Sequence, residues 1–110
     1  MTKTHSLADE FADAMFDVYR RAVREANYKP RAFLDKLTRD GALVTAHYLL
    51  HTGQTAGFTA LWQRKRLDLT VEYLILQPKW KSLFSDDDRD IAVQRLRAHG
   101  YTGKIKGGTP

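Results

Sequence analysis

The fold is decided by the segment Leu67-Asp-Leu-Thr-Val-Glu-Tyr-Leu-Ile-Leu76. Its apolar residues would occupy nearly every face of a helix, so the segment is either a central buried helix or a buried strand. A strand needs a partner strand, and the chain contains no second strand-like run. We therefore expect a helix here, with Asp68 as its N-cap residue, and an all-α fold.

The residues before this segment predict four helices. Ser6 followed by Asp9 has the spacing of a capping box, and apolar residues then recur at helical spacing over about 7–26. We expect a second helix that begins at Pro30, a third after the Asp40-Gly41 break, and a fourth capped by Thr55. The apolar stripe expected for the third helix consists of Leu43, Val44, His47 and Leu50.

The residues after this segment predict one more helix. Pro78 ends the central element, and an aromatic linker with Trp80 follows it. Ser85 and Asp88 repeat the capping-box spacing, and Gly100 has the position of a left-handed C-cap. We expect one helical domain over residues 1–101, a compact bundle of five to seven short helices, and a flexible basic C-terminal tail over 102–110.

The composition excludes several classes of protein. The 110 residues include no Cys, which removes disulfides, thiolate metal sites and cysteine nucleophiles. The stretch from Gly41 to Gln63 has no charged residue, but polar residues from His47 to Thr55 would interrupt a membrane span at its middle. The first residues lack the apolar core of a signal peptide, so we expect a cytoplasmic protein that binds no membrane.

The charge distribution favours a nucleic-acid interface as one interpretation. The chain has 18 Lys and Arg against 13 Asp and Glu, a net charge of +5, and Arg64-Lys65-Arg66 supplies over half of this excess. Residues of about 43–66 resemble a helix-turn-helix unit in length, which would bind DNA or RNA through polar and basic side chains. The residues expected at such an interface are Gln54, Thr55, Thr59, Gln63, Arg64, Lys65 and Arg66, with Arg20, Arg21 and Arg24 beside them.

No pattern predicts a metal, a cofactor or catalysis. His47 and His51 are four residues apart, as in a helical metal site, but Tyr48 stands where a HExxH motif needs Glu, and spacing identifies no third ligand. We expect a partly buried histidine pair that packs and forms hydrogen bonds. The run Asp86-Asp87-Asp88 lacks the spacing of a calcium loop and is typical of a helix N-terminus. The serines lie at expected caps or in the linker, so no nucleophile is visible.

Three charged residues around the central segment are expected to be structural. Charges within an apolar run must face the surface or be paired. Arg66 could pair with Asp68 or with Glu72 and hold the junction between the fourth helix and the central segment.

One longer stretch resembles a known family. The run Gly57-Phe-Thr-Ala-Leu-Trp-Gln-Arg-Lys-Arg-Leu-Asp-Leu-Thr-Val-Glu72 is similar to a signature of small uncharacterised bacterial helical domains, and further similarities extend over roughly residues 11–101. Lys65 stands where that family more often has Gly. The resemblance implies a non-catalytic bacterial accessory domain and supplies no catalytic residues. We therefore expect a domain that binds a larger bacterial protein, with the aromatic residues Trp62, Trp80 and Tyr101 as candidate interface residues.

Overall fold

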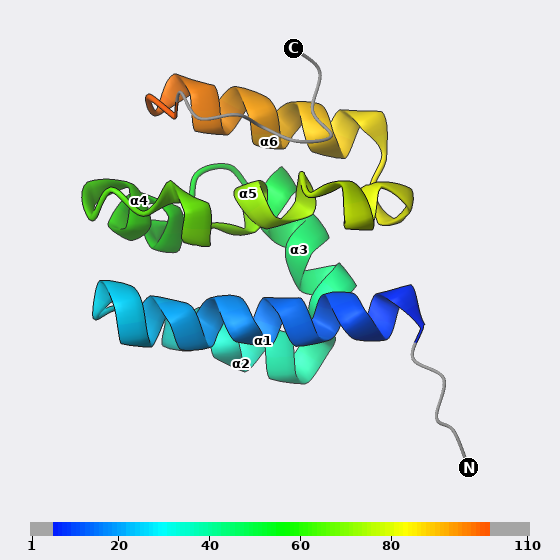
Figure 1. Ribbon diagram of the computed structural model, residues 1–110, viewed down its shortest axis with the longest axis horizontal. Helices are drawn as coiled ribbons and strands as arrows, with labels where there is room; N and C mark the ends of the chain where they lie inside the picture. Colours follow the sequence, from blue (N-terminus) through cyan, green and yellow to red (C-terminus); the bar gives the residue numbers. More distant parts are fainter. Residues whose placement is uncertain (1–5, 102–110) are drawn as a thin grey trace.

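Six α-helices and two 3-10 helices make up residues 6–101, the part of the chain that this computed structural model describes (Figure 1). In chain order they are α1 (Leu7–Ala26), α2 (Arg31–Asp40), α3 (Ala42–His51), α4 (Ala56–Gln63), η1 (Leu67–Leu69), α5 (Val71–Ile75), η2 (Pro78–Leu83) and α6 (Asp86–Ala98). These residues contain no strand, so the prediction of an all-α bundle is confirmed. No helix among them combines the length and the apolar character that a membrane crossing needs. The predicted tail over 102–110 lies outside the described residues.

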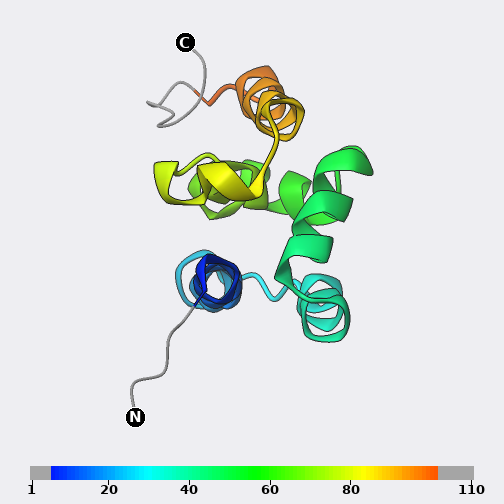
Figure 2. The same ribbon diagram turned by 90° about the vertical axis from the view of Figure 1, so that its right-hand side faces the viewer.

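The helices stack in three levels that α3 connects. In Figure 1, α1 and α2 form the lowest level, α4 and α5 the middle one, and α6 the upper one. Figure 2 shows α3 rising from α2 along one side of the middle level, and α3 packs against α1, α2, α5 and α6. The buried core joins these levels through fully buried side chains from all of them, which include Phe11, Met15, Leu50, Ile75 and Leu96.

The predicted helix ends agree with the structure where they depend on local hydrogen bonds. The Ser6 and Ser85 hydroxyls accept the amides of Asp9 and Asp88, and both capping boxes are complete. Thr55 caps α4 in the same way, with Phe58 N–H as the donor. Gly100 has φ +84°, the left-handed conformation expected of a helix C-cap. These turns need only neighbouring residues, which explains why the sequence pattern predicts them.

The segment over 67–76 is helical but is not one helix. Leu67–Leu69 forms the 3-10 helix η1, and α5 begins only at Val71. The N-cap residue of α5 is Thr70, not the predicted Asp68: its hydroxyl donates to Leu67 O at 2.6 Å and accepts from Tyr73 N at 3.2 Å. Both Leu67 and Leu69 are buried in this arrangement. In one continuous helix, residues two apart point to different faces.

Two smaller predictions are corrected. The helix α2 begins at Arg31, one residue after Pro30. In α3 the predicted stripe is shifted, because Val44 is 57% exposed while Ala42 and Ala46 are buried beside Leu50. Packing against α1, α2 and α6 on several sides selects small residues for the inner face of α3, and a stripe counted from large apolar residues misses this.

Candidate binding site

A cavity of about 640 Å³ lies between α1, α2, α3, α4 and the segment from η1 to α5. Cavities of roughly 300–1,000 Å³ are the size that hold small ligands in proteins. It lies where the core is divided: Ala22, Leu61 and Leu69 form a small buried cluster apart from the main one, and all three line the cavity. Phe58 and Val71 of the main cluster line it as well. The cavity is therefore an open, mostly apolar hollow where two parts of the core meet.

Thr45 is a buried polar residue beside the cavity. It lies on α3 with no exposed surface, and its hydroxyl has no hydrogen-bond partner among the described residues. A threonine within a helix usually donates to the carbonyl four residues earlier, which would be that of Gly41. A buried polar group without a partner destabilises a protein by about 1–3 kcal/mol. Thr45 lies behind the surface of the cavity, because its side chain has no exposed surface even though the cavity is empty.

The cavity lining carries more basic than acidic side chains. The basic ones are Lys29, Arg31, Lys36 and Arg39, and the acidic ones are Asp35 and the buried Glu72. Lys36 and Arg39 both pair with Asp40, at 2.8 and 3.2 Å, and these hydrogen bonds lower the pKa of Asp40. Lys29 and Arg31 are exposed and pair with no carboxylate within residues 6–101. The lining therefore favours an anionic occupant.

Glu72, one of the two alternative partners considered for Arg66, pairs with Arg95 of α6. Glu72 Oε2 accepts from Arg95 Nη1 at 2.6 Å, and both side chains are almost completely buried. Arg95 also donates to the carbonyls of Leu49 and Leu50 at the end of α3. Burial raises the pKa of Glu72, although the bond from Arg95 acts in the opposite direction. One arginine thus joins α3, α5 and α6 behind the cavity.

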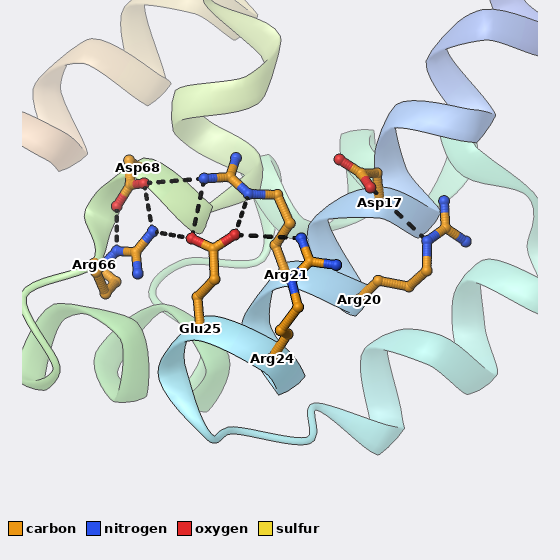
Figure 3. A network of polar contacts seen from close by, with 7 residues as sticks. All are labelled: Asp17, Arg20, Arg21, Arg24, Glu25, Arg66 and Asp68. Carbon is orange, nitrogen blue, oxygen red and sulfur yellow. Dashed lines mark hydrogen bonds and ion pairs between the residues drawn. The ribbon is translucent and has the colours of Figure 1, made fainter.

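Arg66 does form the predicted pair with Asp68, within a larger network (Figure 3). Its guanidinium contacts Asp68 at 3.0 Å and Glu25 of α1 at 2.7 Å. Arg21 bonds Glu25 at 2.9 Å and lies 3.7 Å from Asp68. Hydrogen bonds from Arg21 and Arg66 lower the pKa of Glu25 to about 2, and bonds to Asp68 and Glu25 raise that of Arg66. The network joins the end of α1 to the start of η1.

The predicted nucleic-acid residues do not form one basic face. Arg21 and Arg66 are neutralised by Glu25 and Asp68, as Figure 3 shows. Arg24 contacts Glu25 at 3.5 Å, and Arg20 contacts Asp17 at 3.8 Å. Three carboxylates are therefore interleaved with these four arginines, which lowers the positive potential that phosphate binding needs.

The remaining residues of that predicted interface have mixed roles. Arg64 donates to the carbonyls of Ala26 and Ala60, so it completes the ends of α1 and α4. Thr55 is the cap of α4, and Gln54 donates to Thr59 at 2.6 Å. Gln63 and Lys65 are exposed. Lys65 has φ +60°, a left-handed conformation in which Gly is favoured.

The three aromatic residues predicted for a protein interface lie in different environments. Trp62 is exposed, with its ring edge-on to that of His99 at 4.9 Å. Tyr101 is half-buried and packs on Tyr73 at 5.7 Å. The expectation for Trp80 is wrong: it is only 6% exposed and packs edge-on against Phe11 in the core. Folding of the η2 linker onto α1 buries it, and the linker sequence does not indicate in which direction the ring points.

His47 and His51 do lie together, and they face an acidic residue that spacing could not identify. His51 Nε2 lies 2.7 Å from Asp88 Oδ1, and His47 Nε2 lies 3.2 Å from Asp88 Oδ2. Asp88 also accepts from Ser85 N–H. Burial acts to raise the pKa of Asp88, but the bonds from His51 and Ser85 outweigh it and the pKa is lowered. Within residues 6–101 no group of three or more His, Asp or Glu side chains is arranged so that it could hold a metal ion.

Of the residues that the sequence patterns indicate for a site, Thr55 and Glu72 line the cavity. Thr45, Lys29 and Arg31 were not singled out, because a threonine in a helix and cations beside Pro30 carry no recognisable spacing. The only available signal was the uncharged stretch from Gly41 to Gln63, which supplies much of the apolar wall. No family model, curated protein or solved structure matches this chain.

Proposed function

We propose that this chain is a non-catalytic domain that binds a partner protein, and that the cavity between α1, α2, α3 and α4 receives a side chain of that partner. The binding face consists of the cavity and the exposed side chains around it. Protein interfaces concentrate their binding energy in a few anchor side chains that fill pockets of the partner. Such a pocket can hold an anchor side chain of a partner without any catalytic group.

The observation that carries this proposal is the open gap in the core beside an exposed aromatic residue. Tyr48 lines the cavity and is 51% exposed, although it follows buried Thr45 and Ala46 on the same helix. Lys36 lies over its ring at 4.3 Å, which holds the ring at the edge of the cavity. A large exposed aromatic residue next to an apolar cavity is typical of a contact surface.

The ion pairs of the Arg66 network favour a protein partner over DNA or RNA. A phosphate backbone would have to compete with Glu25 and Asp68 for Arg21 and Arg66. Breaking these pairs would offset much of the free energy that phosphate contacts contribute. An interface at the cavity requires no such rearrangement.

Site-specific photo-crosslinking in host cells tests this proposal. The photoreactive amino acid p-benzoylphenylalanine replaces Tyr48 in one variant and exposed Gln94 in a control, since α6 contributes no residue to the cavity lining. We expect a defined protein adduct from position 48 that position 94 does not form. Mass spectrometry of the adduct identifies the partner and the segment that is attached.

A blocking substitution then tests whether the cavity itself is used. Ala56 lines the cavity and is exposed, so Ala56→Trp should fill its opening without disturbing the core. Ala98, exposed at the end of α6, provides the matched control Ala98→Trp. We expect Ala56→Trp to weaken binding of the purified partner at least tenfold and Ala98→Trp to leave it unchanged. Equal adducts from both positions, or equal binding by both variants, would refute the proposal.

A further inference from the structure

We infer that the partner presents an acidic amphipathic helix to the cavity, and that at least two large apolar side chains on one face of this helix enter it together. This inference rests on the proposed function and adds the conformation and the charge of the partner segment. The size of the cavity, its helical walls and the basic residues of its lining each supply one part of it.

The size of the cavity requires more than one side chain. Its volume of about 640 Å³ lies in the middle of the range, roughly 300–1,000 Å³, of pockets that bury whole small-molecule ligands. A single Leu or Phe side chain is smaller than such a ligand, so it would leave part of the apolar lining in contact with water. Phe33, Leu49 and Val71 belong to this lining. Two neighbouring apolar side chains remove more of this surface from water, which favours binding roughly in proportion to the area covered.

The walls of the cavity favour a helix over an extended segment. They come from α1, α2, α3, α4 and the segment from η1 to α5, and residues 6–101 contain no strand. An extended peptide therefore finds no strand edge in this part of the chain with which it could form backbone hydrogen bonds. A helix bonds its own N–H and C=O groups, so it needs only side-chain contacts. Residues three or four positions apart lie on one face of a helix, which places two apolar side chains next to each other.

The basic residues of the lining favour acidic residues around the apolar pair. Lys29 and Arg31 are exposed and pair with no carboxylate among the described residues. Lys36 and Arg39 share the single carboxylate of Asp40. Carboxylates of a partner can therefore pair with cations of the lining without displacing a carboxylate of this chain.

The two carboxylates of the lining oppose this charge only in part. Glu72 is 4% exposed and is bonded to Arg95, so its charge is already compensated. Asp35 is the other acidic residue of the lining, and it faces the two unpaired cations Lys29 and Arg31 in the charge balance. The lining is therefore net positive, which attracts an acidic helix and repels a basic one.

Four synthetic peptides of about 18 residues, long enough to form a helix in water, separate these requirements. The first consists of Glu, Ala and Gln with two Leu residues four positions apart at its centre. In the second, the two Leu residues are two positions apart, so they point to different faces of the helix while the composition is unchanged. The third has Ala in place of one Leu, and the fourth has Lys in place of every Glu. Circular dichroism establishes that the peptides are equally helical.

Binding is measured by NMR titration of the ¹⁵N-labelled full chain, with the amides of Gly57 and Val71 as reporters of the cavity. We expect the first peptide to bind with a Kd below about 1 mM. The second and third peptides should bind at least about threefold more weakly, because only one Leu can enter the cavity at a time. The Lys peptide should bind at least about fivefold more weakly, because its charge has the sign of the lining.

Charge reversal in the chain tests the basic lining directly. The double variant Lys29→Glu, Arg31→Glu reverses its two unpaired cations, and Lys81→Glu, Arg97→Glu makes the same change of net charge at exposed positions outside the lining. At about 0.15 M salt, exposed charges beyond about 8 Å are largely screened. We therefore expect the first double variant to bind the Glu peptide at least about tenfold more weakly and the Lys peptide more tightly, and the second to bind both within about twofold of the original chain.

Several outcomes would overturn the inference. Equal binding of the first and second peptides would contradict a helical face, and equal binding of the first and third would contradict a pair of anchors. Binding of the Lys peptide as tight as that of the Glu peptide would contradict the acidic flanks, and absence of shifts at Gly57 and Val71 with millimolar peptide would exclude such a helix from the cavity.

These failures are distinguishable from failure of the proposed function. If position 48 captures a partner whose attached segment lacks paired apolar residues, three or four positions apart, among acidic ones, the domain binds protein and this inference is wrong. If position 48 captures no defined partner, the proposed function itself fails, and this inference fails with it.

Discussion

The ion pair between Glu72 and Arg95 allows the sharpest test of how this bundle is held together. Its two side chains are 5% and 12% exposed, and their charged atoms lie 2.6 Å apart. Removing one member of a buried pair destabilises a protein by about 3–5 kcal/mol, since the other charge stays buried alone. Arg95→Met also removes two hydrogen bonds to the carbonyls of Leu49 and Leu50. A domain of this length has roughly 5–15 kcal/mol of stability, so we expect Arg95→Met to lose about 4 kcal/mol, or about 16 °C in Tm.

The pH dependence of this loss identifies its cause. Burial already raises the pKa of Glu72 in the folded state, and loss of Arg95 removes the bond that opposes this rise. A carboxyl with a raised folded pKa contributes stability below its unfolded pKa and loses it as the pH rises through the folded value. We therefore expect the loss in Arg95→Met to be smallest near about pH 4 and to grow toward about pH 7.5.

Urea unfolding followed by circular dichroism at both pH values measures these losses. Arg97→Met, two residues away and exposed, is the matched control and should change stability by less than about 0.5 kcal/mol. The double variant Glu72→Leu, Arg95→Met should recover part of the loss, because no charge then remains buried. A loss below about 1 kcal/mol at neutral pH, or one that does not depend on pH, would refute this account of the pair.

Three further predictions concern single residues. Lys65→Gly should stabilise the chain by about 0.5–1 kcal/mol in urea unfolding, because φ +60° strains Lys and not Gly; a loss of stability would contradict this. Thr45→Val should leave the stability of the free protein unchanged or raise it by about 1 kcal/mol, since the hydroxyl has no partner among the described residues; a marked loss would mean that it has one. Asp88→Asn should flatten the fall of stability in acid. Because the pKa of Asp88 is lowered in the folded state, its contribution to stability is present above its unfolded pKa near 3.8 and is lost as the pH falls through the lower folded value. An unchanged acid profile would exclude a contribution of Asp88 to stability.

The parts of the fold that the sequence predicts well are those governed by neighbours along the chain. Ser6, Thr55 and Ser85 each bond an amide three residues later, so their capping role is visible as a spacing. The left-handed Gly100 follows from the absence of a side chain at that position. The left-handed conformation of Lys65 could not be predicted in this way, because a residue with a side chain rarely adopts it.

Neither the cavity nor the contacts between distant residues could be predicted from spacing, because packing brings their members together. His51 meets Asp88 37 residues later, and Arg95 reaches Leu49 O across 46 residues. Arg66 pairs with Glu25, 41 residues earlier, as well as with the neighbouring Asp68 that the pattern indicated. The burial of Trp80 depends likewise on where η2 meets α1.

The amino-acid sequence by itself determined that this chain is helical and where most of its helices begin and end, because backbone hydrogen bonds and caps within a helix join residues three or four apart. Only the tertiary structure decided which charges are neutralised, which aromatic residues are buried, and that the core divides around a cavity. These properties depend on distances between separate helices, which are set by how their side chains fill the shared space.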